Sequence, residues 1–239
     1  MSTIVVTGTN TDVGKTMAVA ALARLLADAG FTVTCVKPAQ TGEPAGSGDM
    51  VTVTRLSGIT DTHEFARYPE PLAPNQSASR AGMTQLDFDD TIARIAALDS
   101  GDDTVVLVEG AGGLLVRIAD DWTIRDVARR LDAPLVVVTS TGLGSLNLAE
   151  LTVTAARDAK VTVAGLVGGS VPTDPDLATH LNLTEFEVVT GCPLLGCLPE
   201  GAGQLERSEF AAMAAESFDT AALLAALGLA PATGPTPGE

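Results

Sequence analysis

Short runs of apolar and β-branched residues recur along the chain, and few of them alternate with polar residues. The runs cover residues 4–6, 32–36, 105–108, 135–138 and 161–167. Strands that are buried on both faces of a parallel sheet have this pattern, because neither face meets water. The pattern therefore predicts the buried strands of a parallel sheet.

Helical segments with start and stop signals separate these runs. The signals are Gly30 after a helix over 16–29, Asp87 at the start of a helix over 87–98, the capping-box pair Thr123 and Asp126, and Ser145 as the cap of a helix that extends to Ala159. Alternating strands and helices predict β-α-β units with right-handed crossovers. We expect a single α/β domain over residues 1–228, with helices on both faces of a mostly parallel sheet.

Two segments depart from this alternation. Residues 42–80 are rich in Gly, Pro, Ser and Thr, with one short helix predicted after Asp49. A loop of this length is either a functional insertion or a floppy one. Residues 229–239 carry three prolines and two glycines, so we expect a disordered C-terminal tail.

The composition narrows the possible partners. A net charge of −16 and a pI near 4.3 oppose binding to nucleic acid or anionic membranes. No apolar run approaches the ~18 residues of a membrane span, and the first residues lack the features of a signal peptide, so we expect a cytoplasmic protein. Cys35, Cys192 and Cys197 are an odd set without C-x-x-C spacing, which favours buried thiols over disulfides or a metal site.

The segment from Gly8 to Thr16 lies between the first predicted strand and the first predicted helix and ends in Gly14-Lys15-Thr16. Glycines there let successive backbone N–H groups point inward, and the helix N-terminus adds positive potential, so the loop can hold phosphate oxygens. Lys15 is placed to reach the terminal phosphates and Thr16 to bind Mg²⁺. The five residues between Gly8 and Gly14 exceed the standard four, which makes this a variant P-loop rather than an ordinary strand-to-helix turn. We expect a P-loop NTPase-like fold that binds a nucleotide.

Further polar residues lie at the ends of the neighbouring predicted strands. Lys37 precedes Pro38 and is either a ligand-facing cation or a solvated lysine. Thr41, on the same loop, offers a hydroxyl. Glu109 ends an apolar strand, as a Walker-B Mg²⁺ ligand does, and needs a metal or a lysine beside it because a buried carboxylate alone is costly. Asp49 is either a second metal ligand or a helix N-cap.

Three segments together resemble the dethiobiotin synthetase family. They are Gly-Thr-x-Thr-x-Val-Gly-Lys-Thr at 8–16, Lys37-Pro38 with Thr41-Gly42, and Val108-Glu109-Gly110-Ala111-Gly112-Gly113. The five-residue spacing of the P-loop is typical of that family. Residues 142–147 also match a family segment, and the resemblance extends from Ser2 to Glu200.

The resemblance implies an ATP- and Mg²⁺-dependent cyclo-ligase of biotin biosynthesis. In that family 7,8-diaminopelargonate takes up CO₂ on one amine to give a carbamate, which ATP then phosphorylates. The second amine attacks the carbamic–phosphoric anhydride, so that the ring closes and dethiobiotin, ADP and phosphate are formed. Such catalysis rests on positioning and charge stabilisation and needs no covalent enzyme intermediate.

The resemblance also implies roles for individual residues. The catalytic residues would be Lys15, Lys37 and Thr11, and the Mg²⁺ ligands Thr16, Asp49 and Glu109. The nucleotide contacts would be Asp12, Val13, Gly14, Lys15, Thr16, Met17, Glu109, Gly169, Pro199, Glu200 and Gly201. The substrate contacts would be Thr41 and Gly112, joined by Gly144, Ser145, Leu146 and Asn147 from the partner subunit of a homodimer.

Two positions depart from the family pattern. Where members often carry an Asn that reads adenine, this chain has Gly168-Gly169-Ser170, so acceptance of a nucleotide other than ATP stays open. Leu148 stands where a His can occur at the dimer contact. His63 and His180 match no catalytic position and are expected on the surface.

Three other functions compete with the synthetase. A partitioning-type regulatory P-loop ATPase would carry a signature lysine five residues before Lys15, where this chain has Asn10. A cobyrinate-type amidating enzyme would carry a glutaminase domain, for which 239 residues leave no room. A non-enzymatic nucleotide-binding scaffold would not need Lys37, Asp49 and Glu109 around one crevice.

Overall fold

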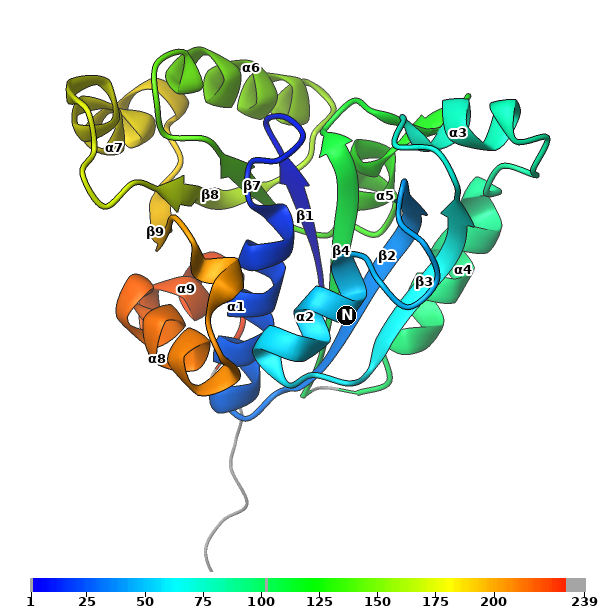
Figure 1. Ribbon diagram of the computed structural model, residues 1–239, viewed down its shortest axis with the longest axis horizontal. Coiled ribbons are helices and arrows are strands. Elements are labelled where there is room, and N and C mark those ends of the chain that lie inside the picture. The colour runs from blue at the N-terminus through cyan, green and yellow to red at the C-terminus, as the bar shows by residue number, and fades with distance from the viewer. Residues whose placement is uncertain (1, 102, 231–239) are drawn as a thin grey trace, which may run out of the picture.

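The computed structural model describes residues 2–101 and 103–230. Within them, seven strands form a parallel sheet in the order β3-β2-β4-β1-β7-β8-β9 (Figure 1). The strands are β1 (Thr3–Gly8), β2 (Thr32–Thr41), β3 (Thr62–Tyr68), β4 (Thr104–Gly113), β7 (Leu135–Thr139), β8 (Val163–Val171) and β9 (Leu194–Pro199). A small antiparallel pair, β5 (Arg117–Ala119) and β6 (Trp122–Thr123), lies apart from the sheet.

Helices cover both faces of the sheet, as predicted (Figure 1). Helices α1 (Lys15–Asp28), α2 (Asp49–Ser57), α8 (Arg207–Ser217) and α9 (Thr220–Ala226) pack on one face. Helices α3 (Pro74–Arg80), α4 (Phe88–Leu98) and α5 (Ile124–Arg130) pack on the other, with the end of α6 (Ser145–Asp158). Helix α7 (Leu177–Thr190) packs beside α6.

The apolar strands are buried on both sides, which explains why they do not alternate with polar residues. In β1, Ile4 and Val6 contact the core under α1, whereas Val5 contacts the core under α5. In β4, Leu107 and Val108 divide between the two cores in the same way. Burying each such side chain contributes about 1.5–3 kcal/mol, so the burial of these strands on both faces stabilises the fold.

Most predicted helix ends agree with the structure. The side chain of Asp87 caps α4 by accepting a hydrogen bond from Asp90 N at 2.8 Å, and the capping box of Thr123 and Asp126 begins α5. The prediction that Ser145 is the N-cap of the next helix is wrong by one position. Ser145 is the first residue of α6, and Gly144 is the N-cap, with φ 90°.

The segment 42–80 contains more helix and strand than the long loop with one short helix that the sequence indicated. The predicted short helix is α2, but β3 and α3 were missed. Strand β3 lies at the sheet edge, is half-buried and carries charged residues such as Glu64 and Arg67, so it lacks an apolar run. Helix α7, strand β9 and helices α8 and α9 were also not predicted.

Three further expectations concern the thiols, the membrane and the tail. Cys35 and Cys192 are buried free thiols, and burial raises the pKa of Cys35 to about 12; Cys197 is half-buried. Among the described residues, no helix has the length and apolar character needed to cross a bilayer.

Leu229 packs against the core, and the rest of the predicted tail from residue 231 lies outside the described residues.

Candidate active site

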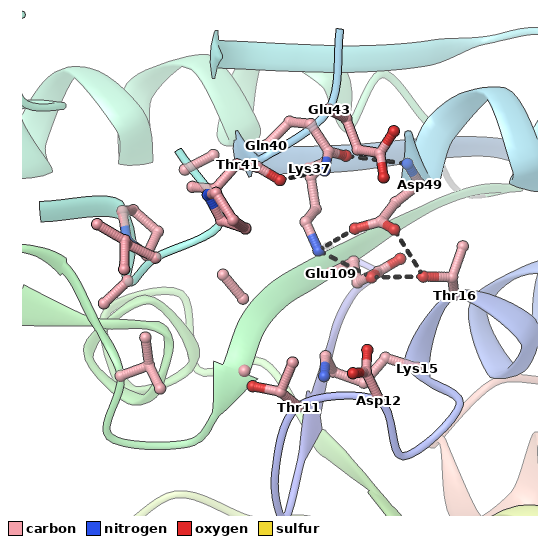
Figure 2. Close-up of a pocket in the computed structure, with 18 of the residues that line it drawn as sticks. Thr11, Asp12, Lys15, Thr16, Lys37, Gln40, Thr41, Glu43, Asp49 and Glu109 are labelled. Atoms are coloured by element: carbon pink, nitrogen blue, oxygen red, sulfur yellow. Dashed lines mark hydrogen bonds and ion pairs between the residues drawn. The ribbon is translucent and has the colours of Figure 1, made fainter. Parts of the chain in front are cut away.

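A cavity of about 750 Å³ opens at the carboxyl ends of β1, β2 and β4, where the sequence predicted a ligand site. It is bordered by the P-loop, the start of α2 and the segment before α3. Eleven predicted site residues line it: Thr11, Asp12, Gly14, Lys15, Thr16, Met17, Lys37, Thr41, Asp49, Glu109 and Gly112. Figure 2 shows that the labelled side chains among them converge on one space from several elements.

The P-loop is held by its backbone and by a neighbouring strand. Gly14 has φ 93° and is the N-cap of α1, and no acidic residue occupies the first turn of that helix. A Cβ atom on Gly14 would lie 2.3 Å from the carbonyl oxygen of Gly169, so a side chain does not fit there. Free N–H groups at the start of α1 and the positive end of its dipole make this an anion-binding end.

Lys15 is buried at the mouth of this loop, and its Nζ donates a hydrogen bond to the carbonyl oxygen of Asn10 at 3.0 Å. Burial lowers the pKa of Lys15, and the nearby charge of Lys37 lowers it further. The two lysines therefore create positive potential in the same part of the cavity.

Lys37 lies between two carboxylates, as Figure 2 shows. Its Nζ is 2.5 Å from Asp49 Oδ2 and 2.9 Å from Glu109 Oε1, and it also donates to the carbonyl oxygen of Gly110 at 2.9 Å. Burial acts to lower the pKa of Lys37, but Glu109 and Asp49 outweigh it and raise that pKa, so the amine stays protonated. The alternative of a solvated lysine is therefore wrong, because the side chain of Lys37 is 4% exposed, and its contact with a ligand stays a prediction.

Glu109 is the most constrained acid of the cluster, because its side chain is 1% exposed. Burial raises its pKa to about 7 despite the opposing charge of Lys37. For Asp49, burial acts to raise the pKa, but Lys37 and Thr16 hold it below the ordinary value. The cluster therefore carries two lysines and two acids whose charges depend on one another.

Three oxygen-bearing side chains meet beside Lys37. Thr16 Oγ1 lies 3.0 Å from Asp49 Oδ1 and 3.1 Å from Glu109 Oε1. Glu109 Oε2 is buried and has no hydrogen-bond partner among the described residues. An orphaned carboxylate oxygen next to a hydroxyl and a second carboxylate fits a hard cation such as Mg²⁺, which takes oxygen ligands.

The far side of the cavity is more apolar than the P-loop side. Pro71, Leu72 and Val116 line it, together with Gly112. Gly112 has φ 64°, and a Cβ atom there would lie 2.8 Å from Val116 Cγ2. Pro71, Leu72 and Val116 could not be recognised from the sequence, because they belong to no motif and reach the cavity only through the folding of the segments that follow β3 and β4.

The remaining predicted site residues do not line the cavity. They are Val13, Gly144, Ser145, Leu146, Asn147, Gly169, Pro199, Glu200 and Gly201. Gly169 abuts the P-loop: a Cβ atom on it would lie 1.8 Å from the carbonyl oxygen of Val13. The glycine at this departure from the family pattern therefore lets β8 approach the loop closely.

Two sets of these residues, 199–201 and 144–147, lie in segments whose surroundings the structure shows. Pro199 ends β9, and the short 3₁₀ turn that follows Gly201 approaches Met17, whose Sδ would lie 3.1 Å from a Cβ on Gly203. Residues 144–147 begin α6, where Ser145 Oγ bonds to Ser140 Oγ at 3.0 Å. The histidines at 63 and 180 are likewise not part of the cavity lining.

Known proteins place this chain clearly. A sequence family described as AAA domain matches residues 2–205. The ATP-dependent dethiobiotin synthetase BioD of Corynebacterium diphtheriae is 60% identical over 210 residues, which cover 88% of this chain and 94% of that protein. The protein of the same name from Rhodococcus jostii is 52% identical over 222 residues, covering 92% and 96% of the two chains.

Solved structures resemble the fold. The septum site-determining protein MinD of Pyrococcus horikoshii, complexed with Mg-ADP, has a TM-score of 0.57 at 15% identity, covering 92% of this chain and 94% of that one. A ParA family ATPase from Chlorobium tepidum has a TM-score of 0.53 at 16% identity, covering 95% and 99%. Such low identities show the P-loop NTPase fold alone. The much higher identity to the synthetases decides the family: the chain belongs to the dethiobiotin synthetases.

Proposed function

We propose that this protein is an ATP- and Mg²⁺-dependent dethiobiotin synthetase, which converts 7,8-diaminopelargonate, CO₂ and ATP to dethiobiotin, ADP and phosphate. The observation that carries the proposal is the 60% identity, over 88% of the chain, to the synthetase of C. diphtheriae. The cavity supports it, because cations and metal-binding oxygens surround a space that has an apolar far side. Since the reaction consumes a nucleoside triphosphate, we place it in the cytoplasm.

The P-loop would hold the triphosphate. The N–H groups at the start of α1 and the buried Lys15 supply donors and positive charge for phosphate oxygens. The turn after β9 would border the base, because it lies against Met17 beside the P-loop helix. Gly169 would act indirectly, by allowing the P-loop to pack on β8.

Thr16, Asp49 and Glu109 would hold Mg²⁺. The unpartnered Glu109 Oε2 and the adjoining hydroxyl and carboxylate support this assignment. When bound, the ion neutralises negative charge on the phosphates. Asp49 and Glu109 also fix Lys37, so the same two acids orient the cation of the site.

Lys37 would supply fixed positive charge where the carbamate and the transferring phosphoryl group meet. Its raised pKa keeps it protonated, so it stabilises anions and does not act as a base. The hydroxyls of Thr11 and Thr41, on opposite walls of the cavity, would position the carbamate. Ring closure then requires the free amine to lie within reach of the activated carbonyl carbon, which is a matter of positioning.

The alkyl chain of the substrate would lie along Pro71, Leu72 and Val116, and its carboxylate would leave the cavity. We propose that residues 144–147 of a second copy of the chain receive that carboxylate, at the N-terminus of α6. Leu143, which precedes them, is 92% exposed, and further leucines are exposed on α6 and α7. Exposed apolar residues on these two neighbouring helices support an interface, and thus a homodimer.

The reaction itself tests the proposal. Protein, 7,8-diaminopelargonate, bicarbonate and Mg-nucleotide are incubated, and the product is analysed by mass spectrometry for a cyclic urea. ATP, CTP and GTP are compared in parallel, which also measures the base preference. Nucleotide hydrolysis without a cyclic urea would refute the synthetase while leaving nucleotide binding intact.

A further inference from the structure

The first turn of α2, which carries Asp49, has no side-chain cap of its own. Its N-cap is Gly48, with φ 111° and ψ −170°, a conformation that residues with a side chain rarely adopt. The first N–H groups of a helix need partners from elsewhere. Here the amide of Asp49 donates to Gln40 Oε1 at 2.9 Å, as Figure 2 shows. The cap is therefore supplied by strand β2.

Gln40 is well placed to cap α2, because it is only 4% exposed and its side chain is shielded from water. Its Nε2 donates to the carbonyl oxygen of Thr41 at 3.2 Å, which fixes the orientation of the side-chain amide. A Cβ atom on Gly48 would lie 2.8 Å from Gln40 Oε1, so the chain passes as close to the amide as a glycine allows. Both the hydrogen bond and the packing hold the start of α2 against β2.

A second side chain holds the loop between β2 and α2 from the edge of the sheet. Arg67 of β3 is the register partner of Gln40. Its guanidinium donates to the carbonyl oxygens of Glu43, Pro44 and Ser47 at 3.0, 2.9 and 3.0 Å, and pairs with Glu64 at 2.6 Å. The planar guanidinium of an arginine has five N–H donors, so it can bind several fixed acceptors at once. The loop is therefore tied at three points between its two ends.

We propose that Gln40 and Arg67 are positioning residues that fix the entry into α2 and thereby hold the carboxylate of Asp49 at the Mg²⁺ site. The proposal rests on the proposed function, in which Asp49 is a metal ligand. Asp49 is within reach of Lys37 and Thr16 only because its backbone is held where β2 and the loop place it. Residues that orient metal ligands in this way change metal affinity without touching the metal.

The test compares Gln40→Met, Gln40→Glu and Arg67→Lys with the wild type. Methionine keeps the length of the side chain but loses the acceptor, whereas glutamate keeps an acceptor for the Asp49 amide. Lysine keeps the charge opposite Glu64 but cannot reach three carbonyls at once. We expect Gln40→Met to need roughly tenfold more Mg²⁺ for half-maximal activity, with kcat at saturating Mg²⁺ near that of the wild type. Gln40→Glu keeps the acceptor but loses the donor to the Thr41 carbonyl oxygen, so it should raise the Mg²⁺ requirement less than methionine does. Arg67→Lys should shift the requirement in the same direction as methionine.

A second readout uses the metal-free protein and needs no activity. Hydrogen–deuterium exchange is followed by mass spectrometry in peptides that span residues 43–57. Gln40→Met should exchange faster there than the wild type, and the exchange of Gln40→Glu should lie between the two. The matched control is Gln85→Met, because Gln85 Oε1 accepts from the amide of Asp120 at 2.9 Å, outside the cavity lining. That variant should leave both the Mg²⁺ requirement and the exchange of residues 43–57 unchanged.

The outcomes separate this inference from the proposed function. A wild-type Mg²⁺ requirement and wild-type exchange in Gln40→Met would overturn the positioning role; if that variant does not fold, the same results in Arg67→Lys would overturn it. Asp49→Asn is measured beside them. If Asp49→Asn keeps the wild-type Mg²⁺ requirement, the assignment of Asp49 as a ligand fails, whereas the exchange data still decide whether Gln40 and Arg67 hold the start of α2.

Discussion

Replacing Lys37 by methionine removes the cation that two acids share. Lys37 is 4% exposed and Glu109 is 1% exposed, whereas the side chain of Asp49 is 29% exposed. Methionine fills nearly the same volume, so the change isolates the charge and leaves the packing largely intact. Asp49 can turn toward water, but Glu109 is left in the core without its partner.

Removing one partner of a buried ion pair typically costs about 3–5 kcal/mol. The partial exposure of Asp49 and the fit of methionine place the expected loss at the lower end, about 3 kcal/mol at pH 8. The sign of the pH dependence follows from Glu109. Burial already raises its pKa from the ordinary 4.5 to about 7 with Lys37 present, and losing Lys37 raises it further. A carboxyl with a raised pKa in the folded state makes the fold less stable as the pH rises from its unfolded pKa to its folded pKa.

The assay is urea unfolding of the metal-free protein in EDTA at pH 5, 6, 7 and 8, followed by the fluorescence of Trp122, which is the single tryptophan and is buried. The free energy of unfolding of Lys37→Met should fall further below that of the wild type as the pH rises. Adding Glu109→Gln should recover about 2 kcal/mol at pH 8, because no buried charge then remains unpaired. Both variants should lack synthetase turnover. If Lys37→Met is as stable as the wild type at pH 8, or if the second substitution recovers nothing, the reasoning about the shared charge is refuted.

Three further predictions concern the P-loop and the second copy of the chain. Lys15→Ala should keep the wild-type unfolding midpoint but lose turnover and bind nucleotide more weakly by calorimetry; turnover at the wild-type rate would contradict its role. Gly169→Ala should lower stability by about 1–3 kcal/mol in thermal unfolding, since its Cβ would lie 1.8 Å from the Val13 carbonyl oxygen, and an unchanged midpoint would contradict the close packing of β8 on the P-loop. Mixing Lys37→Ala and Asn147→Ala proteins after subunit exchange should restore about a quarter of wild-type activity, because half of the dimers are then mixed and each carries one intact site. An inactive mixture, with exchange shown by native mass spectrometry, would argue against a site shared between subunits.

The strands and the P-loop could be predicted because their signals are local. The runs 4–6 and 105–108 are apolar since both faces of those strands are buried, and the GKT sequence at the start of α1 is set by the chemistry of phosphate binding. Strand β3 could not be predicted in this way. It lies at the sheet edge and has no apolar pattern. One of its polar residues, Arg67, donates hydrogen bonds to the loop between β2 and α2.

Within the site, the sequence identified the groups that carry charge but not those that hold them. Lys37 and Glu109 were recognisable at the ends of two predicted apolar strands, although β2 and β4 continue past them to Thr41 and Gly113. The ion pair between them depends on β2 and β4 being neighbours, which only the folded sheet establishes. Gln40 was not singled out, because the hydrogen bond that defines its role joins residues nine positions apart through an irregular turn. Its signal in the sequence is faint, since a polar residue at the end of a strand is ordinarily solvated.

We propose above that ATP phosphorylates a carbamate bound in the cavity at the carboxyl ends of β1, β2 and β4, and that this step activates the carbamate for ring closure. This proposal is tested most directly in a single turnover with C¹⁸O₂, 7,8-diaminopelargonate and Mg-ATP, with the released phosphate analysed by mass spectrometry. The carbamate oxygen that attacks the terminal phosphorus leaves with it on ring closure, so the account predicts one ¹⁸O in each phosphate formed along with dethiobiotin. Dethiobiotin accompanied by unlabelled phosphate would contradict it.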